Sequence, residues 1–250
     1  MIAPDPHRIG RILAIDWART AALLAMAAFH FGRDFEVLGL VPPGTTFGGL
    51  WDLSARGIAG SFLFLAGLSL WLAHGGGIRW RGYLQRLALL IGAAAAVSVA
   101  TYLAVPGAWI RFGILHAIAA GSVVSLAFLV VPWPVTAALA GAILWWGPGL
   151  ALPAFDAPWL IWTGLGTRTP FMMDYEPLVP WLAPMLLGVV AGRIGTTLGV
   201  WRSLAEVPAR PGRVAAALAW PGRHSLAVYL IHQPVLLALI WCGAWIAARL

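Results

Sequence analysis

Seven long apolar stretches restrict what this chain can fold into. Each is near the ~17 to 25 residues that an α-helix needs to cross a hydrocarbon core about 30 Å thick. We therefore predict an all-α integral membrane protein, a bundle of about seven transmembrane helices forming one domain over residues 1–250. The predicted spans are residues 11–31, 57–72, 84–105, 112–131, 135–152, 181–198 and 224–248.

The composition supports this class and excludes others. Of the 250 residues 61% are hydrophobic and 10% are charged, whereas roughly a quarter of an average soluble domain is charged. The net charge of +7 comes from arginines that form no dense run, which argues against a nucleic-acid partner. The single cysteine, Cys242, excludes an intramolecular disulfide and a cysteine-rich metal site, and we expect no metal.

The arginines also predict an orientation. With the amino terminus in the cytoplasm, ten arginines lie in inner segments and five in outer ones, with Arg19 inside the membrane. This bias favours a cytoplasmic amino terminus and an outer carboxyl terminus, in a bacterial cytoplasmic membrane. Arg8 and Arg11 before an apolar run resemble a signal peptide, but Asp16 interrupts that run, so we expect 11–31 to remain a mature helix.

The first span carries a polar stripe. At about 100° per residue, Asp16, Arg19 and His30 fall along one side of a helix. An ionisable group in a bilayer costs between ~2.5 and more than ~10 kcal/mol, so the stripe should face protein or a wet cavity. We interpret it as a functional site, although a structural salt bridge between Asp16 and Arg19 would explain that pair equally well.

Asp34 follows His30 by four residues. If the helix continues past Gly32, the carboxylate can orient the imidazole and leave its second nitrogen free as a general base. The alternative is a capping histidine beside a solvated acid. Farther inside, Arg19 together with Arg86 and Arg223 could bind a phosphorylated ligand from the cytoplasm.

Other ionisable residues are predicted at both ends of the bundle. Arg111 and His116 lie at the outer start of the fourth span, and Asp174 and Glu176 precede the sixth at the same boundary. A buried structural histidine and solvated loop acids are the alternatives. We predict two half-sites joined by one polar route, with His30, Asp34, His116 and Asp174 outside and Asp16, Arg19, His224 and His232 inside.

The last span has a polar face. Ser225, Tyr229 and His232 fall within about 60° of one another, so this face should point inward. Pro234 is expected to kink the helix. Small residues elsewhere, Gly188 with Gly192 and Gly57 near Gly60, indicate close helix packing.

Five segments in this order resemble one family. They are RILAIDWARTAALLAMAAFHFGRDF, IAGSFLFLAGLSLWLA, IRFGILHAIA, DYEPLVPW and GRHSLAVYLIHQPV. The chain is similar over nearly its whole length to bacterial membrane proteins grouped with heparan-alpha-glucosaminide N-acetyltransferase catalytic domains. These resemble the wider acyltransferase-3 class, which has a first-helix arginine and a histidine at the outer end of that helix.

The resemblance implies acyl transfer from cytoplasmic acyl-CoA, such as acetyl-CoA, to a sugar or other hydroxyl or amine acceptor outside. Inner residues would hold the CoA phosphates, namely Arg19, Arg86 and Arg223 with Asp16, His224, Ser225 and His232. His30 would be the base or a transient acyl carrier, oriented by Asp34. Arg111 and His116 would support the oxyanion or the acceptor, with Asp174 and Glu176 binding the acceptor.

The match to the animal enzyme is incomplete. That enzyme aligns an asparagine with His30, and its histidine precedes the segment written here GGLWDLSARG, so its catalytic histidine does not carry over. His30 is supported instead by the acyltransferase-3 pattern.

Two other functions compete with acyl transfer. A transporter or flippase of a small or lipid-linked polar solute could use the same stripe as a pathway, but no inverted repeat is visible. An inactive partner subunit that retains the fold would not bind CoA. The expected partners are membrane lipids, acyl-CoA and a carbohydrate or glycolipid acceptor. A homodimer is one of the oligomeric states left open.

Overall fold

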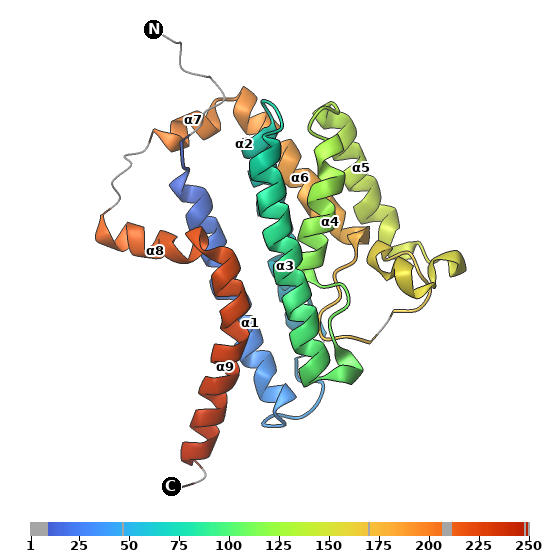
Figure 1. The fold of residues 1–250 in the computed structure, drawn as a ribbon, viewed down its shortest axis with the longest axis vertical. Helices are drawn as coiled ribbons and strands as arrows, with labels where there is room; N and C mark the ends of the chain where they lie inside the picture. Colours follow the sequence, from blue (N-terminus) through green and yellow to red (C-terminus); the bar gives the residue numbers. More distant parts are fainter. Residues whose placement is uncertain (1–9, 47, 170, 207–211, 248, 250) are drawn as a thin grey trace. The chain divides into compact units, whose positions relative to one another are not determined.

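The computed structural model describes residues 10–46, 48–169, 171–206, 212–247 and 249, and their regular structure is helical (Figure 1). The chain divides into two compact units. The terminal unit, as we call it, contains Gly10–Phe62 and Leu204–Leu250, and the central unit contains Leu63–Ser203. The boundaries between them fall inside α2, Gly49–His74, and α7, Val200–Ala205.

The terminal unit is built around α1, Leu13–Val37. This helix packs against both α8, Arg213–Arg223, and α9, Ser225–Ala247 (Figure 1). Ile15, Leu23 and Met26 lie on one side of α1 and are buried. The first predicted span and the last are therefore neighbours.

The central unit contains the end of α2 and helices α3, α4, α5 and α6. Helix α4 packs against α3 and α6, and α6 also packs against α5. Small side chains such as Ala140 and Ala183, both fully buried, bring α5 and α6 together. The bounds are Trp80–Ala104 for α3, Ile114–Ala127 for α4, Trp133–Trp146 for α5 and Leu178–Thr197 for α6.

Short 3-10 helices occupy the connections of the central unit. They are η1, Pro106–Ala108, η2, Gly147–Gly149, η3, Pro153–Phe155, and η4, Pro158–Thr163.

Four helices, α2, α3, α6 and α9, are long and apolar enough to cross a membrane. The chain is therefore an all-helical integral membrane protein. Helix α1 overlaps predicted span 11–31 and continues past Gly32 to Val37, as the argument for Asp34 required, while its crossing of the membrane stays a prediction. The total of seven spans and the orientation of the termini remain predictions.

The fourth and fifth helices are shorter than the predicted spans 112–131 and 135–152. Each has 14 residues, which corresponds to about 21 Å of helix against a core of about 30 Å. Helix α5 ends at Trp146 because Gly147 and Pro148 begin a 3-10 turn, and proline has no N–H to donate. Helix α8 lies outside all seven predicted stretches.

The prediction that small residues allow close helix packing is confirmed for Gly188 and Gly192 and is wrong for Gly57. A Cβ atom at Gly188 would lie 2.0 Å from the carbonyl oxygen of Phe64, and one at Gly192 would lie 2.7 Å from Cβ of Trp71. Close packing therefore requires both glycines. A Cβ atom at Gly57 would meet nothing within 4 Å, because this residue lines an open groove rather than a helix contact.

Candidate functional site

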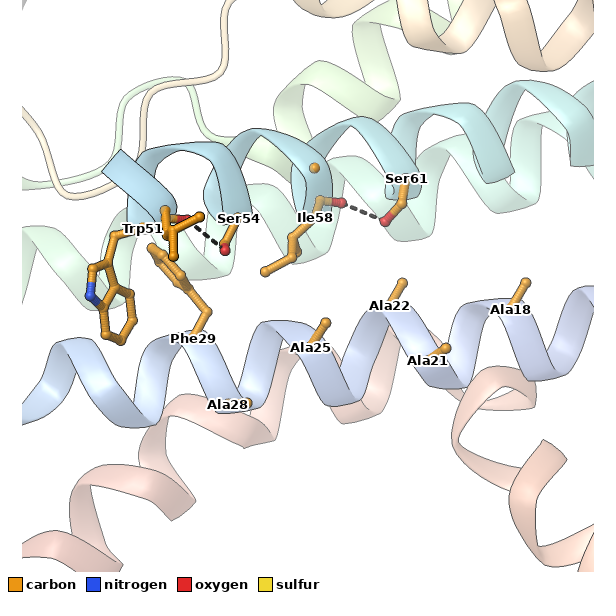
Figure 2. A pocket seen from close by; sticks show the side chains of 12 residues that line it. Ala18, Ala21, Ala22, Ala25, Ala28, Phe29, Trp51, Ser54, Ile58 and Ser61 are labelled. Carbon is orange, nitrogen blue, oxygen red and sulfur yellow. Dashed lines mark hydrogen bonds between the residues drawn. The ribbon is translucent and has the colours of Figure 1, made fainter. Parts of the chain in front are cut away.

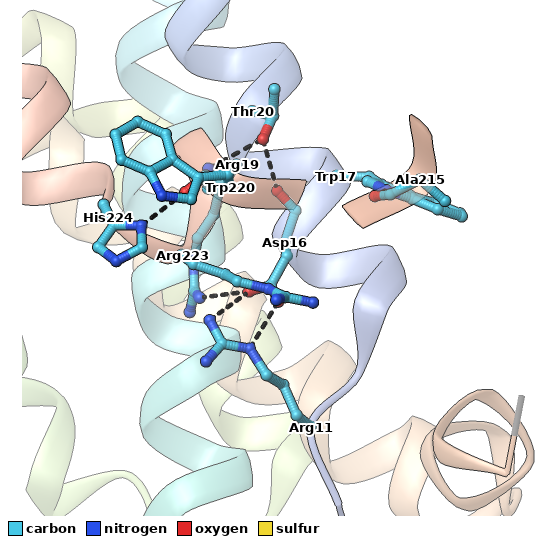
Figure 3. A network of polar contacts seen from close by, with 10 residues as sticks. Arg11, Asp16, Trp17, Arg19, Thr20, Ala215, Trp220, Arg223 and His224 are labelled. Atoms are coloured by element: carbon cyan, nitrogen blue, oxygen red, sulfur yellow. Dashed lines mark hydrogen bonds and ion pairs between the residues drawn. The ribbon is translucent and has the colours of Figure 1, made fainter. Parts of the chain in front are cut away.

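The amino-terminal end of α1 holds a cluster of three guanidinium groups around one buried carboxylate (Figure 3). Asp16 is 2% exposed. Arg11 Nε lies 2.7 Å from its Oδ2 and Arg223 Nε lies 3.4 Å from the same atom. Arg19 Nη1 lies 3.5 Å from Oδ1, so the predicted Asp16–Arg19 ion pair is confirmed.

The close approach of α8 to α1 brings Arg223 into this cluster. The hydroxyl of Thr20 donates to the carbonyl oxygen of Asp16 at 3.1 Å and accepts the N–H of Gly222 at 2.9 Å. A Cβ atom at position 222 would lie 1.9 Å from the same carbonyl oxygen. A glycine is therefore required directly before Arg223.

The cluster is rich in positive charge. Among the described residues, three guanidinium groups lie within ion-pair distance of the one carboxylate of Asp16. The side chains of Arg11, Arg19 and Arg223 are 58%, 24% and 32% exposed, so a ligand can reach them. Guanidinium groups bind phosphate oxygens through paired, charge-assisted hydrogen bonds. This arrangement can bind an anion.

His224 and Ser225 lie where α8 gives way to α9. The imidazole of His224 is exposed, and its Nδ1 lies 2.9 Å from the carbonyl oxygen of Trp220. Ser225 is half-buried as the first residue of α9. Both predicted residues thus adjoin Arg223 on the same two helices.

Two histidines meet nearer the other end of α1. The ring centroids of His30 and His232 are 5.1 Å apart, one from α1 and the other from α9. His232 Nδ1 is hydrogen-bonded to the carbonyl oxygen of Tyr229. Its Nε2 is buried without a hydrogen-bond partner in the described part of the chain. The structure therefore places His232 with His30, in the outer group rather than the inner one.

Asp34 is buried one turn farther along α1, but it does not orient His30 as expected. Its Oδ1 accepts a hydrogen bond of 2.7 Å from the side-chain amide of Gln233. Its Oδ2 is buried and has no partner among the described residues. Because α9 packs along α1, the amide of Gln233, 199 residues later in the sequence, takes the place at Asp34 that was expected for the imidazole of His30.

His116 lies at the start of α4 in the central unit, and both its nitrogens are engaged. Nδ1 accepts the N–H of Gly113 at 3.2 Å, and Nε2 lies 3.3 Å from the hydroxyl oxygen of Ser98. That hydroxyl donates to the carbonyl oxygen of Ile110 at 2.7 Å. These contacts fit a neutral imidazole that is protonated on Nε2. His116 thus joins α4 to α3.

Asp174 and Glu176 form a half-buried acidic pair at the same helix start. Asp174 Oδ2 accepts the N–H of Ile114 at 2.9 Å and caps α4. Burial raises the pKa of both carboxyl groups, and the charge of Asp174 raises the pKa of Glu176 further. Glu176 Oε2 is buried without a partner among the described residues. Arg111 is exposed beside Trp109, 5.7 Å from its ring centroid.

Arg86 lies in the central unit, whereas the other predicted inner residues belong to the terminal unit. It lines a small cavity of about 20 Å³ with His74 and Tyr83. The shared cavity predicted for His30 and His116 likewise involves both units and stays a prediction. Among the described residues, no group of three or more His, Cys, Asp or Glu side chains could hold a metal ion.

Comparison with known families gives one result. Residues 11–234 match the family model described as heparan-alpha-glucosaminide N-acetyltransferase, catalytic. The chain belongs to this family. No curated protein and no solved structure gives a significant match. The family resemblance inferred from the sequence segments is confirmed, and it makes this chain a membrane protein of a transferase family.

The region matched by the heparan-alpha-glucosaminide N-acetyltransferase model runs from Arg11 to one residue beyond Gln233. It includes four residues that sequence reasoning did not select for the site: Arg11, Thr20, Gly222 and Gln233. Arg11 precedes the apolar run and looked like an ordinary inner-face arginine. The other three act through contacts between α1 and the last two helices, about 200 residues apart in sequence, so no local pattern marks them.

Proposed function

We propose that this protein is an acyltransferase that moves an acetyl or other acyl group from cytoplasmic acyl-CoA to a hydroxyl or amine acceptor at the outer face of a bacterial cytoplasmic membrane. The carrying observation is the cluster of three guanidinium groups around Asp16, at the start of the helix that also carries His30, in a member of this transferase family. The two sites are about 16 Å apart along α1, since eleven residues separate Arg19 from His30.

The inner site is the proposed donor site. Arg11, Arg19 and Arg223 present partly exposed guanidinium groups there. Asp16 holds these groups in place, because each of them pairs with its carboxylate. CoA carries a diphosphate and a 3'-phosphate, which match a cluster with excess positive charge. His224 and Ser225 adjoin this site, and Arg86 remains a proposed contributor from the central unit.

The outer site is the proposed transfer site. His30 accepts the proton of the acceptor hydroxyl or amine, whose oxygen or nitrogen then attacks the thioester carbonyl. The new C–O or C–N bond forms as the C–S bond breaks, and the proton passes to the CoA sulfur. His232 lies beside His30 with a free buried nitrogen and can share that proton. Transient acylation of His30 itself is the covalent version of the same step.

Residues of the central unit are proposed to serve the acceptor. Asp174 and Glu176 can bind its polar groups, and Arg111 can stabilise the oxyanion. His116 is proposed as a positioning residue, because both its nitrogens are already engaged at the start of α4.

The first test is calorimetric titration of the detergent-purified protein with acetyl-CoA and with a CoA analogue lacking the 3'-phosphate. We expect saturable binding that weakens about tenfold in Arg11→Ala, the loss expected for one charge-assisted contact. Arg56→Ala is the matched control, because Arg56 forms an exposed ion pair with Asp52. Absence of binding at millimolar acetyl-CoA to folded protein would contradict the proposed function.

The second test separates chemistry from binding. His30→Ala should bind acetyl-CoA like the unchanged protein and lose acyl transfer by a factor on the order of 100 or more. The control is Cys242→Ser, a substitution at an exposed position on α9. It reports any effect of mutation and purification alone and should keep full activity. Undiminished transfer by folded His30→Ala would remove His30 from the mechanism.

A further inference from the structure

A groove of about 780 Å³ runs between α1 and the first part of α2, within the terminal unit (Figure 2). Figure 2 shows the α1 wall as a row of small side chains. They are Ala18, Ala21, Ala22, Ala25 and Ala28. None of the residues assigned to the donor or transfer site lines this groove.

The wall of the groove is apolar, and the few polar groups in it do not change this. No lining residue is charged. The two hydroxyl groups in the wall already donate within α2, from Ser54 to the carbonyl oxygen of Leu50 and from Ser61 to that of Ile58, each at 2.7 Å. The hydroxyl hydrogens of the wall are therefore already used, and the natural occupant of this apolar groove is a hydrocarbon chain.

The small residues here do not serve helix packing. At Gly188 an added Cβ atom would meet backbone at 2.0 Å, whereas at Gly57 in the groove it would meet nothing within 4 Å. Ala18, Ala21, Ala25 and Ala28 are exposed, although they form one face of α1. Small side chains on this face create space rather than close contact.

The position of the groove matches one leaflet of a bilayer. From Ala18 to Phe29 it follows eleven residues of α1, about 16 Å, which is half of a hydrocarbon core about 30 Å thick. The end of the groove at Phe29 carries Trp51, an aromatic residue of the kind that lies at headgroup level. A Cβ atom at Gly32 would lie 2.3 Å from Cη2 of Trp51, so this indole rests directly on α1.

The aromatic end of the groove lies at the level of the proposed transfer site along α1. Phe29, which lines the groove, directly precedes His30, and their ring centroids are 5.6 Å apart. Ala25 is about 180° around the helix from Asp16 and about 140° from His30, so the groove lies on a different face of α1 from both. A chain in the groove brings its polar end to the level of His30, and that end has to extend around α1 to reach the imidazole.

We propose that the groove binds the hydrocarbon chain of an outer-leaflet lipid whose headgroup hydroxyl or amine is the acyl acceptor. This inference rests on the proposed function and names the class of its acceptor as lipid-anchored. The chain lies along α1 with its polar end at the level of His30. Anchoring in this way confines the acceptor group to the site and lowers the entropy cost of transfer.

The test compares two acceptors with the same amine headgroup, dodecyl glucosaminide and methyl glucosaminide, in nanodiscs with acetyl-CoA. We expect the unchanged protein to favour the dodecyl compound in kcat/KM by about tenfold or more. Ala25→Trp fills the groove and should abolish this preference without changing the rate with the methyl compound. Leu24→Trp, at an exposed α1 position outside the groove, is the matched control that should retain it.

A second measurement needs no acyl transfer. A dodecyl glucosaminide with a diazirine in its chain is photolysed on the protein, and the labelled peptides are mapped. Labels on α1 and α2 that disappear in Ala25→Trp but not in Leu24→Trp support the proposal. Labels elsewhere, a crosslink between two copies of the chain at these alanines, or an equal preference in both variants would overturn it. Loss of acetyl-CoA binding and of all transfer, with labelling intact, would overturn the proposed function instead.

Discussion

Asp16 holds together the arginine cluster at the amino-terminal end of α1. Its buried carboxylate faces three guanidinium groups, so Asp16→Asn leaves their charges uncompensated. Because these arginines are partly exposed, we expect a loss of about 1 to 3 kcal/mol rather than the larger cost of a fully buried pair. Thermal unfolding of the detergent-purified protein measures it. Asp52→Asn, which removes an exposed partner of Arg56, should cost about 0 to 1 kcal/mol, and an equal loss in both variants would contradict the prediction.

The raised pKa of Glu176 predicts that the stability of the fold depends on pH. Burial and the nearby Asp174 raise its pKa, so the folded state keeps a proton that the unfolded chain releases above its ordinary pKa. Stability should therefore fall as the pH rises from about 5 to 8. Glu176→Gln mimics the neutral acid and should make this fall shallower, as followed by the melting temperature at each pH. The same slope in both proteins would show that folding does not raise the pKa of Glu176.

At the scale of elements, the contact of α8 with α1 depends on Gly222. A Cβ atom there would lie 1.9 Å from the carbonyl oxygen of Asp16 and 3.0 Å from the hydroxyl of Thr20. We expect Gly222→Ala to separate the two helices, lose about 1 to 3 kcal/mol and weaken acetyl-CoA binding, since Arg223 moves with α8. Melting and titration report both effects. Gly243→Ala, in α9 with nothing within 4 Å, should be neutral, and a neutral Gly222→Ala would show that α8 can shift without cost.

The sequence predicts the helices that come from apolar runs but not those that come from contacts. Runs such as 84–105 and 181–198 lie within a few residues of α3 and α6, because membrane helices need sustained hydrophobicity. Helix α8 has mixed composition and is stabilised against α1, which no local pattern reveals. The Asp34–Gln233 hydrogen bond likewise depends on a contact between helices far apart in the sequence, which no local pattern reveals. The polar stripe of α1 was predictable because helical periodicity alone places Asp16, Arg19 and His30 together.

At the scale of the whole molecule, the proposed reaction requires that the two ends of α1 face opposite sides of the membrane. The predicted inner segments are richer in arginine, which predicts that the start of α3 at Arg81 is cytoplasmic and the loop at Arg168 is outside. Both side chains are exposed, and Cys242 is the single cysteine, so Cys242→Ser gives a clean background for labelling. In intact cells a membrane-impermeant maleimide should label Arg168→Cys, and should label Arg81→Cys only after permeabilisation. The reverse pattern would put the arginine cluster outside, away from cytoplasmic CoA, and would contradict transfer in the proposed direction.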